Sequence, residues 1–459
     1  MKHFLIGAFS FFLFSSSLQS QKSFNLKEAI DYAKVNNHNL NIQKLNVQDV
    51  EGQLKEYYAI GLPKLSGSVS YNYFLKLPTS IFPNFISPAI YDVLFDENLL
   101  PRRDIDAGPG VPVQFGTKNN LTAGLEFSTL LFDGSFFVGL KAQRLYKDLI
   151  IKQINQTESE IKYQVTKAYL GALAIQENLI ILNKNISNLQ KVNSDLNEFY
   201  KSGLIEKLDV DRTELSLQNL NTEKEKLQRL ANITLNVLKF QINYPFDQEL
   251  LLSDKLADLL NTSYVEIMDP SIQLNYNARP EYPVILQGLQ LAEINVKRYK
   301  TAYLPSLYGF ASFQESLQRN KLFDSKDNDW FPTSLVGLNL SVPIFDGFDK
   351  KGKIIRAKML LDKTKLQQKQ FESAAQLEFQ NAKIQYLNAN ATIESRKKTI
   401  ALAESIYNTA KIKFKEGVGS SLEVSNAERD LYQAQANLLD AQINLIQAKV
   451  DLDKSMGKI

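Results

Sequence analysis

The sequence predicts an internally duplicated protein of mixed helices and strands, and three observations lead to this fold class. A fifteen-residue stretch, YKSGLIEKLDVDRTE from Tyr200, returns in similar form as FKEGVGSSLEVSNAE from Phe414. Two proline-free stretches of about 70 residues predict very long helices, one from Gly134 to Gly203 and one from Gly347 to Gly417. Segments of alternating apolar and polar residues predict strands ahead of each long helix.

The first residues predict a secretory signal peptide over residues 1–20. Lys2 gives a short positive start, residues 4–14 are apolar, and small polar residues follow. This apolar run is too short to span a bilayer, which needs roughly 20 residues. The alternative to a signal peptide is a short buried helix. No later segment is an uncharged apolar stretch of that length, so strands are the elements expected to span a membrane.

Composition removes several function classes. The 459 residues include no cysteine and two histidines, which excludes disulfides, thiol catalysis and cysteine-based zinc sites. The net charge of +3 gives no indication of nucleic-acid binding. Without a phosphate loop or a Ser/His/Asp set, we expect no enzyme activity, no cofactor and no metal. Asp104 and Asp106 have oxygens that could bind a cation, but the simpler interpretation is that they are solvated.

The first repeat is expected at 21–243. Its elements are a helix, strands near 65–75 and 121–132, a long helix 135–200, a tip 201–207 and a helix 208–243. Between the strands, residues 76–118 contain six of the fourteen prolines, which predicts an exposed loop.

An inter-repeat segment follows at 244–277, and the second repeat at 278–456. The second repeat has the same elements: a helix, strands near 307–316 and 335–345, a long helix 348–414, a tip 415–421 and a helix 422–454. Phe-Asp-Gly ends the second strand of each repeat, at 132–134 and 345–347, and Leu-Pro precedes each first strand, at 62–63 and 304–305. In each repeat the two shorter helices, placed end to end, would approach the length of the long one.

The strands have one apolar and one polar face. Val69, Tyr71 and Tyr73 alternate with serines and an asparagine. This pattern suits a membrane sheet, and a soluble sandwich remains open from the strands alone. Helices of about 100 Å favour the membrane protein, because no compact domain of this size needs them.

The last helix carries two apolar seams, which predicts two helical neighbours. One seam contains Leu431, Ala434 and Leu438, and the other contains Tyr432, Ala436 and Leu439. A wall of helices fits both seams, and an ordinary antiparallel coiled coil remains the alternative.

Together these duplicated motifs resemble the TolC-like outer-membrane efflux proteins over nearly the whole mature chain. The resemblance implies a homotrimer in which four strands per chain contribute to a 12-stranded β-barrel, continued by a long α-helical periplasmic barrel. It also implies a location in the cell outer membrane, in contact with its lipid. An open sheet edge is not tolerated in lipid, so the strand count alone requires oligomerisation.

The resemblance assigns roles to the repeated segment. Gly203, Leu204, Gly417 and Val418 would form the tips that dock a periplasmic adaptor protein. Asp209 matches a family residue that holds the tunnel closed, and Glu423 matches a pore-lining acid. The remaining expected gate residues are Tyr200, Phe414 and Asn426. Asp209 and Glu423 can equally be ordinary acids of a first helical turn, and the glycines can serve the turn alone.

The function that the resemblance implies is that of an exit duct without catalysis. Small molecules would pass from an inner-membrane pump, through the adaptor, to the exterior. A duct for type I protein secretion is the first alternative. A coiled-coil structural protein that forms no channel is the second.

Overall fold

A computed structural model of the chain describes residues 22–83, 85–106, 108, 110–260, 273–321 and 329–459. The expected signal peptide and part of the inter-repeat segment lie outside these residues. The chain forms two compact units. Unit 1 comprises Met1–Glu51, Leu145–Ala292 and Leu360–Ile459, and unit 2 comprises Gly52–Arg144 and Glu293–Met359.

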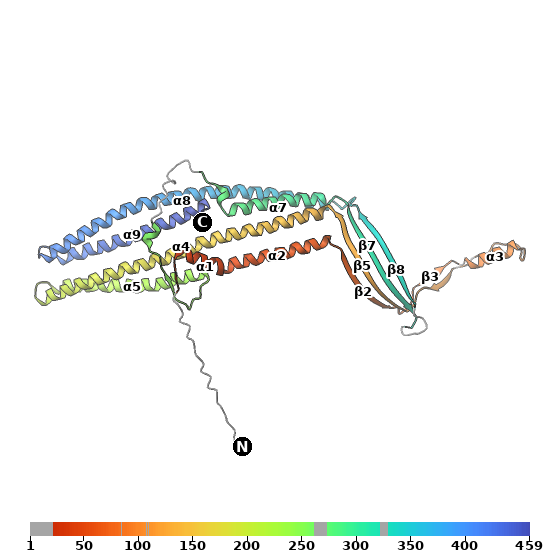
Figure 1. The fold of residues 1–459 in the computed structure, drawn as a ribbon, viewed down its shortest axis with the longest axis horizontal. Coiled ribbons are helices and arrows are strands. Elements are labelled where there is room, and N and C mark those ends of the chain that lie inside the picture. Colours follow the sequence, from red (N-terminus) through yellow and green to blue (C-terminus); the bar gives the residue numbers. More distant parts are fainter. Residues whose placement is uncertain (1–21, 84, 107, 109, 261–272, 322–328) are drawn as a thin grey trace, which may run out of the picture. The chain divides into compact units, whose positions relative to one another are not determined.

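In the described part of the chain, four helices continue from one unit into the other (Figure 1). They are α2 (His38–Gly61), α4 (Gly134–Lys201), α7 (Glu281–Thr301) and α8 (Asp349–Lys415). The two long helices therefore have 68 and 67 residues, close to the lengths that the sequence predicts. None of the described helices has a stretch apolar and long enough to cross a bilayer.

Unit 2 contains a four-stranded antiparallel sheet in the order β2-β5-β7-β8 (Figure 1). Its strands are β2 (Lys64–Tyr73), β5 (Asn119–Asp133), β7 (Ser306–Arg319) and β8 (Trp330–Ser341). The strands of the two repeats therefore pair with each other through β5 and β7. In this sheet β2 and β8 are edge strands, each with one side unpaired.

Two segments of unit 2 differ from the expected outline. β8 begins five residues and ends four residues before the predicted strand near 335–345. It ends early because Pro343 has no amide hydrogen to give to a neighbouring strand. The proline-rich insertion 76–118 has structure of its own. It forms a hairpin of β3 (Thr79–Phe82) and β4 (Val111–Gln114), with the helix α3 (Ile86–Asp96) between them.

Unit 1 holds two helical hairpins and the main core. One hairpin pairs α4 with α5 (Lys207–Ile242), and the other pairs α8 with α9 (Ser421–Met456). The remaining elements are α1 (Leu26–Asn36), a parallel pair of β1 (Lys22–Phe24) and β6 (Leu250–Leu252), α6 (Leu256–Leu260) and the short turn η2 (Tyr276–Ala278). The core contains fully buried Tyr169, Leu170, Leu40 and Leu238.

Tyr169 ties the small sheet to α4. Its hydroxyl donates to the carbonyl of Phe24 at 3.0 Å and accepts from the backbone of Asp254 at 3.4 Å. Because Tyr169 is fully buried, both contacts satisfy polar groups that water does not reach.

The two short helices of each repeat meet end to end in unit 1. In the first repeat, Asn37 Nδ2 donates to the carbonyl of Gln241 at 2.9 Å, and Asn243 Nδ2 donates to the carbonyl of Asn36 at 2.9 Å. In the second, Gly457 ends α9 with φ +73° against the carbonyl of Ala278 just before α7. A side chain at 457 would collide with that carbonyl, so the junction requires glycine.

Candidate functional site

The sheet of unit 2 has one largely apolar face that the chain leaves uncovered, interrupted by Glu315, which the register places opposite Ala123. The register places Leu65 opposite Phe127, and Leu125 opposite Phe313. Exposure on this face is 75% at Val69, 53% at Leu125 and 83% at Val336. The other face of β2 and β5 carries serine, threonine, asparagine and glutamate. An apolar outer face and a polar inner face are what a sheet between lipid and water requires.

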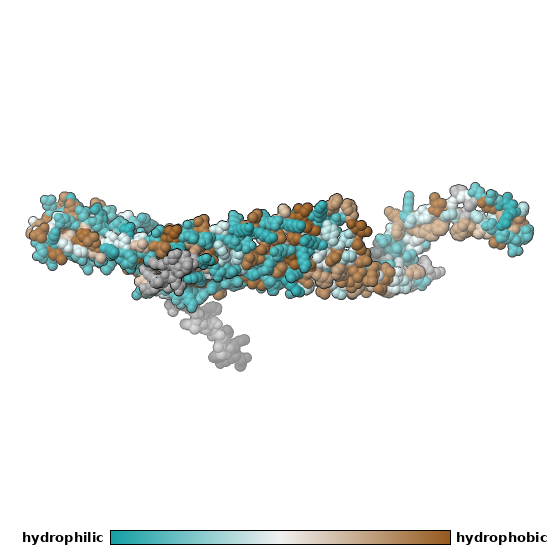
Figure 2. Space-filling view, turned by 90° about the horizontal axis from the view of Figure 1, so that it is seen from above, coloured by the Kyte–Doolittle hydropathy of each residue, from teal (hydrophilic) through white to brown (hydrophobic). Residues whose placement is uncertain are grey.

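Exposed aromatic side chains lie at both ends of this sheet. Tyr73, Phe74, Trp330 and Phe331 lie at the end near the insertion, and Phe132, Tyr303, Phe345 and Phe348 lie at the end near the helices. Figure 2 shows apolar surface gathered where the strands of unit 2 meet its helices. Aromatic girdles of this kind mark the two interfaces of membrane-spanning sheets.

Each hairpin of unit 1 turns through the same backbone motif. Gly203 and Gly417 have φ +72° and +76°, a left-handed conformation that glycine adopts without strain. In the first turn, Gly203 N donates to Tyr200 O and Leu204 N donates to Phe199 O, both at 2.9 Å. In the second, Gly417 N donates to Phe414 O and Val418 N to Lys413 O, both at 3.0 Å. This is the Schellman arrangement, made twice.

The expected docking residues lie in the turns that end the hairpins, between α4 and α5 and between α8 and α9. Leu204 is 71% exposed and Val418 is 78% exposed. An apolar side chain held outward at a rigid turn is suited to contact with another protein.

A hydrogen bond joins the two hairpins just inside the turns. Asp209 lies in the first turn of α5, and its Oδ1 accepts from the hydroxyl of Ser421 at the start of α9. The rings of Phe199 and Phe414 lie 6.4 Å apart, close to the same contact. Phe414 also packs against Ala410, Val424 and Ala427. Polar and apolar contacts therefore both hold the hairpins together here.

The structure separates the expected gate residues into two groups. Asp209 and Phe414 lie at the contact between the hairpins. Tyr200 is 43% exposed, and the ring that meets Phe414 belongs to its neighbour Phe199. Glu423 and Asn426 are both exposed on α9, although Glu423 lies one turn before buried Ala427.

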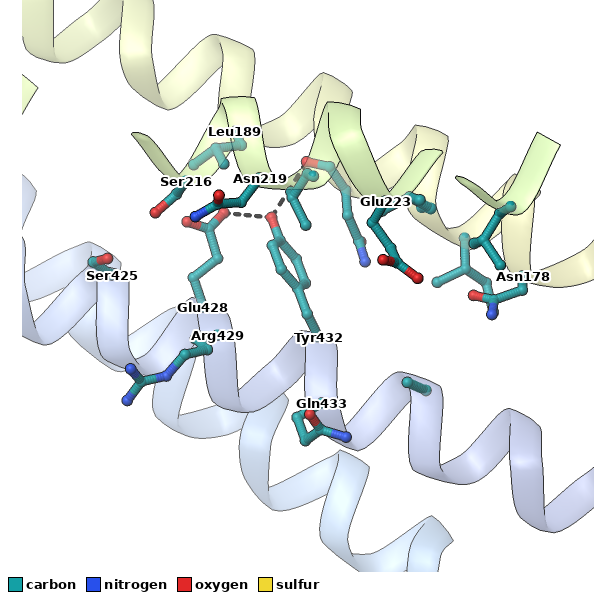
Figure 3. A pocket seen from close by; sticks show the side chains of 16 residues that line it. Asn178, Leu189, Ser216, Asn219, Glu223, Ser425, Glu428, Arg429, Tyr432 and Gln433 are labelled. Atoms are coloured by element: carbon teal, nitrogen blue, oxygen red, sulfur yellow. Dashed lines mark hydrogen bonds between the residues drawn. The ribbon is translucent and has the colours of Figure 1, made fainter. Parts of the chain in front are cut away.

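Above this contact, a cavity of about 530 Å³ lies between α4, α5 and α9 (Figure 3). Glu428 and Tyr432 project into it from α9, and the hydroxyl of Tyr432 donates to the Glu428 carboxylate. The same hydroxyl lies 3.2 Å from the backbone carbonyl of Asn185 on α4. Asn185 Nδ2 donates in turn to Oε1 of Gln435 on α9 at 2.9 Å.

Glu428 is a buried acid with 5% of its surface exposed. Burial raises the pKa of its carboxyl, while the hydrogen bond from Tyr432 and the charge of Lys411 act in the opposite direction. Burial also raises the pKa of Tyr432 and of Tyr407, and the charge of Glu428 adds to both effects.

Sequence reasoning missed three residues of this region. Glu428 could have been found, because it is an acid on the buried face of α9 defined by Val424, Ala427 and Leu431. The sequence pattern places Tyr432 in an apolar seam, and nothing in it indicates a partner for the hydroxyl. Ser421 follows the N-cap Ser420, and nothing in the sequence says which hairpin its hydroxyl would reach.

Comparison with known proteins identifies this architecture. Residues 279–458 match the family model described as outer membrane efflux protein. The fold is similar to that of CusC, with a TM-score of 0.71 and 17% identity over 96% of this chain and 95% of CusC. The CusC structure was described in connection with folding and transmembrane channel formation. The fold is also similar to that of the outer membrane protein VceC from Vibrio cholerae, with a TM-score of 0.70 and 16% identity over 94% and 96% of the two chains.

A curated relative gives a further comparison. The alkaline protease secretion protein AprF of Pseudomonas aeruginosa is 22% identical over 300 residues, which cover 64% of this chain and 60% of AprF.

Proposed function

From its place among the TolC-like outer-membrane efflux proteins, we propose that this chain is the exit duct of a tripartite efflux system. The chain is an outer-membrane protein with a helical periplasmic extension, and it is not an enzyme. Small molecules would enter from an inner-membrane pump through a periplasmic adaptor and leave by diffusion. The observation that carries this proposal is that one chain combines an apolar, open-edged sheet with two exposed hairpin tips.

The open edges support a homotrimer. Isolated in lipid, β2 and β8 would each leave a row of amide and carbonyl groups without partners, at several kcal/mol per group. Pairing β2 of one chain with β8 of the next removes both edges. Three chains would give a closed sheet of twelve strands, as the resemblance implies.

The tips support docking of the adaptor. A trimer would present six turns, three with Leu204 and three with Val418 at the surface. An adaptor hairpin of complementary apolar character would bury these side chains, each contributing roughly 1.5–3 kcal/mol if fully covered.

The gate is proposed at the contact between the hairpins. Asp209 bonded to Ser421 would hold the closed arrangement, supported by Phe414. Glu423 is exposed and free to face the pore, where three copies would form a ring of carboxylates that favours cations. Tyr200 and Asn426 are proposed as neighbours of this ring.

Type I protein secretion is the second candidate, and the name of AprF is the observation that favours it. The two ducts differ in cargo and not in any residue identified above. The third candidate, a coiled-coil structural protein, does not account for the apolar sheet or its aromatic ends.

The test is a double substitution at the tips, Leu204→Ser with Val418→Ser. We expect normal amounts of trimer in the outer membrane but loss of adaptor co-purification and of resistance to efflux substrates. The control is Ile233→Ser, which changes an exposed apolar residue on α5 away from the tips. Unchanged resistance and adaptor binding in the double variant would refute docking at the tips. Loss of a secreted protein from the medium, with resistance retained, would favour secretion.

A further inference from the structure

The hydroxyl of Tyr432 faces two acceptors but has one hydrogen to donate. One acceptor is the carboxylate of Glu428, one turn earlier on the same helix. The other is the backbone carbonyl of Asn185, which belongs to the other hairpin and lies 3.2 Å away. A neutral phenol donates one hydrogen bond at a time, so the two contacts compete unless a second hydrogen is supplied.

Glu428 can supply that hydrogen only when it is protonated. An ionised carboxylate accepts only, so it takes the hydrogen of Tyr432 and leaves the Asn185 carbonyl without it. A neutral carboxyl donates its own hydrogen to the Tyr432 oxygen, and the phenol hydrogen is then free for Asn185. One added proton therefore moves one hydrogen bond from within α9 to between α9 and α4.

We propose that Glu428 and Tyr432 form a proton-operated latch that joins α9 to α4 when Glu428 is protonated and releases it when Glu428 is ionised. The latch deepens the proposed function, since its role as a control of the duct rests on the hairpins being the gate. It lies about two to three helical turns along α9 from the contact of Asp209 with Ser421 and involves different residues.

The surroundings of Glu428 favour its neutral form. From α8, Tyr407 and Lys411 face it, and Lys411 is the cation that opposes the effect of burial. From α9, Arg429 is exposed and directed away from the carboxylate in Figure 3. From α5, Glu223 lines the same cavity, and α4 contributes the uncharged amides Asn178 and Asn185. An acid so placed takes up its proton at a higher pH than an exposed glutamate.

The direction of the pH effect follows from linkage. Because packing of the hairpins raises the pKa of Glu428, the packed state is favoured at low pH and loses this advantage as pH rises through the raised pKa. The cavity beside Asn185 has room for water to replace the released hydrogen bond. Acidification of the periplasm should therefore close the latch.

The absence of cysteine allows a direct test on the whole protein. Spin labels are attached to cysteines introduced at Ser187 on α4 and Asp430 on α9, both exposed. Labelled chains are diluted with unlabelled chains, and the distance distribution is measured between pH 5.5 and pH 8. In the otherwise native chain we expect the population with α4 and α9 far apart to rise about fivefold from pH 5.5 to pH 8. Loss of one hydrogen bond with a net contribution of about 1 kcal/mol changes the equilibrium by this ratio.

Three variants in the same labelled background separate the latch from general packing. Glu428→Gln should remove the pH response and stay packed, because its amide donates permanently to Tyr432. Glu428→Gln with Tyr432→Phe should also be insensitive to pH but about fivefold less packed. Glu223→Gln, the matched control in the same cavity, should keep the native response.

A distance distribution that does not change with pH, or a native response in Glu428→Gln, would overturn the latch. Because the distances are measured without cargo, pump or adaptor, a failure here is separate from a failure of the proposed export function.

Discussion

Removing the hydroxyl of Ser421 should loosen the contact between the two hairpins. In Ser421→Ala, the carboxylate of Asp209 loses its donor from α9. A hydrogen bond to a charged group contributes about 1.5–3 kcal/mol, and both partners here are partly exposed, so water replaces some of this. A remaining loss of about 1 kcal/mol corresponds to roughly a fivefold increase in the separated arrangement. Asp209 itself stays favourable in the first turn of α5, where an acid suits the helix dipole.

The assay is single-channel recording in planar bilayers. The fraction of time in the high-conductance state should rise about fivefold in Ser421→Ala, in line with that loss of about 1 kcal/mol. Ser421→Thr, which keeps the hydroxyl, should resemble the native protein. Ser425→Ala is the matched control, since Ser425 lies one turn after Ser421 on α9 and lines the cavity that holds Glu428. If Ser421→Ala and Ser425→Ala open to the same extent, the hydrogen bond between Ser421 and Asp209 does not hold the closed state.

Three further predictions concern the turns, a buried ion pair and the pore. Gly417→Val should lower the free energy of unfolding by about 1–2 kcal/mol, because its φ of +76° strains a β-branched residue; an unchanged thermal midpoint would contradict this. Arg279→Met should cost about 3 kcal/mol in a denaturant titration, because it leaves Glu281 and Glu378 without the guanidinium that they share; a stabilised variant would contradict this. Glu423→Gln should reduce the cation preference seen in reversal potentials, and an equal preference would place this acid outside the pore.

The long helices and their turns were predictable because local chemistry defines them. A proline-free stretch of about 70 residues ends at a glycine in each repeat, and both glycines have the positive φ that a Schellman turn requires. The strands were predictable from their alternation, apart from the end of β8, where Pro343 stops pairing earlier than the apolar pattern does. The break between α1 and α2 was missed, although asparagine is a favoured N-cap residue and Asn37 Oδ1 accepts from Asn39 N at 2.9 Å and from Leu40 N at 3.3 Å. The amide of Asn37 also donates to Gln241, 204 residues away, a contact that local sequence does not indicate.

The contacts within the candidate site were less predictable, since they depend on how one hairpin faces the other. Asp209 was identified through the resemblance, but its partner Ser421 lies 212 residues further along the chain. Glu428 and Tyr432 share one helix and were within reach of sequence reasoning. Their common target, the carbonyl of Asn185, is a backbone atom that no residue type identifies.

The most direct test of the account is the mass of the full-length protein extracted from the outer membrane in mild detergent, measured by native mass spectrometry. The open edges of β2 and β8 require sister chains, so the account predicts an assembly with the mass of three chains. A stable single chain that needs no detergent would contradict it.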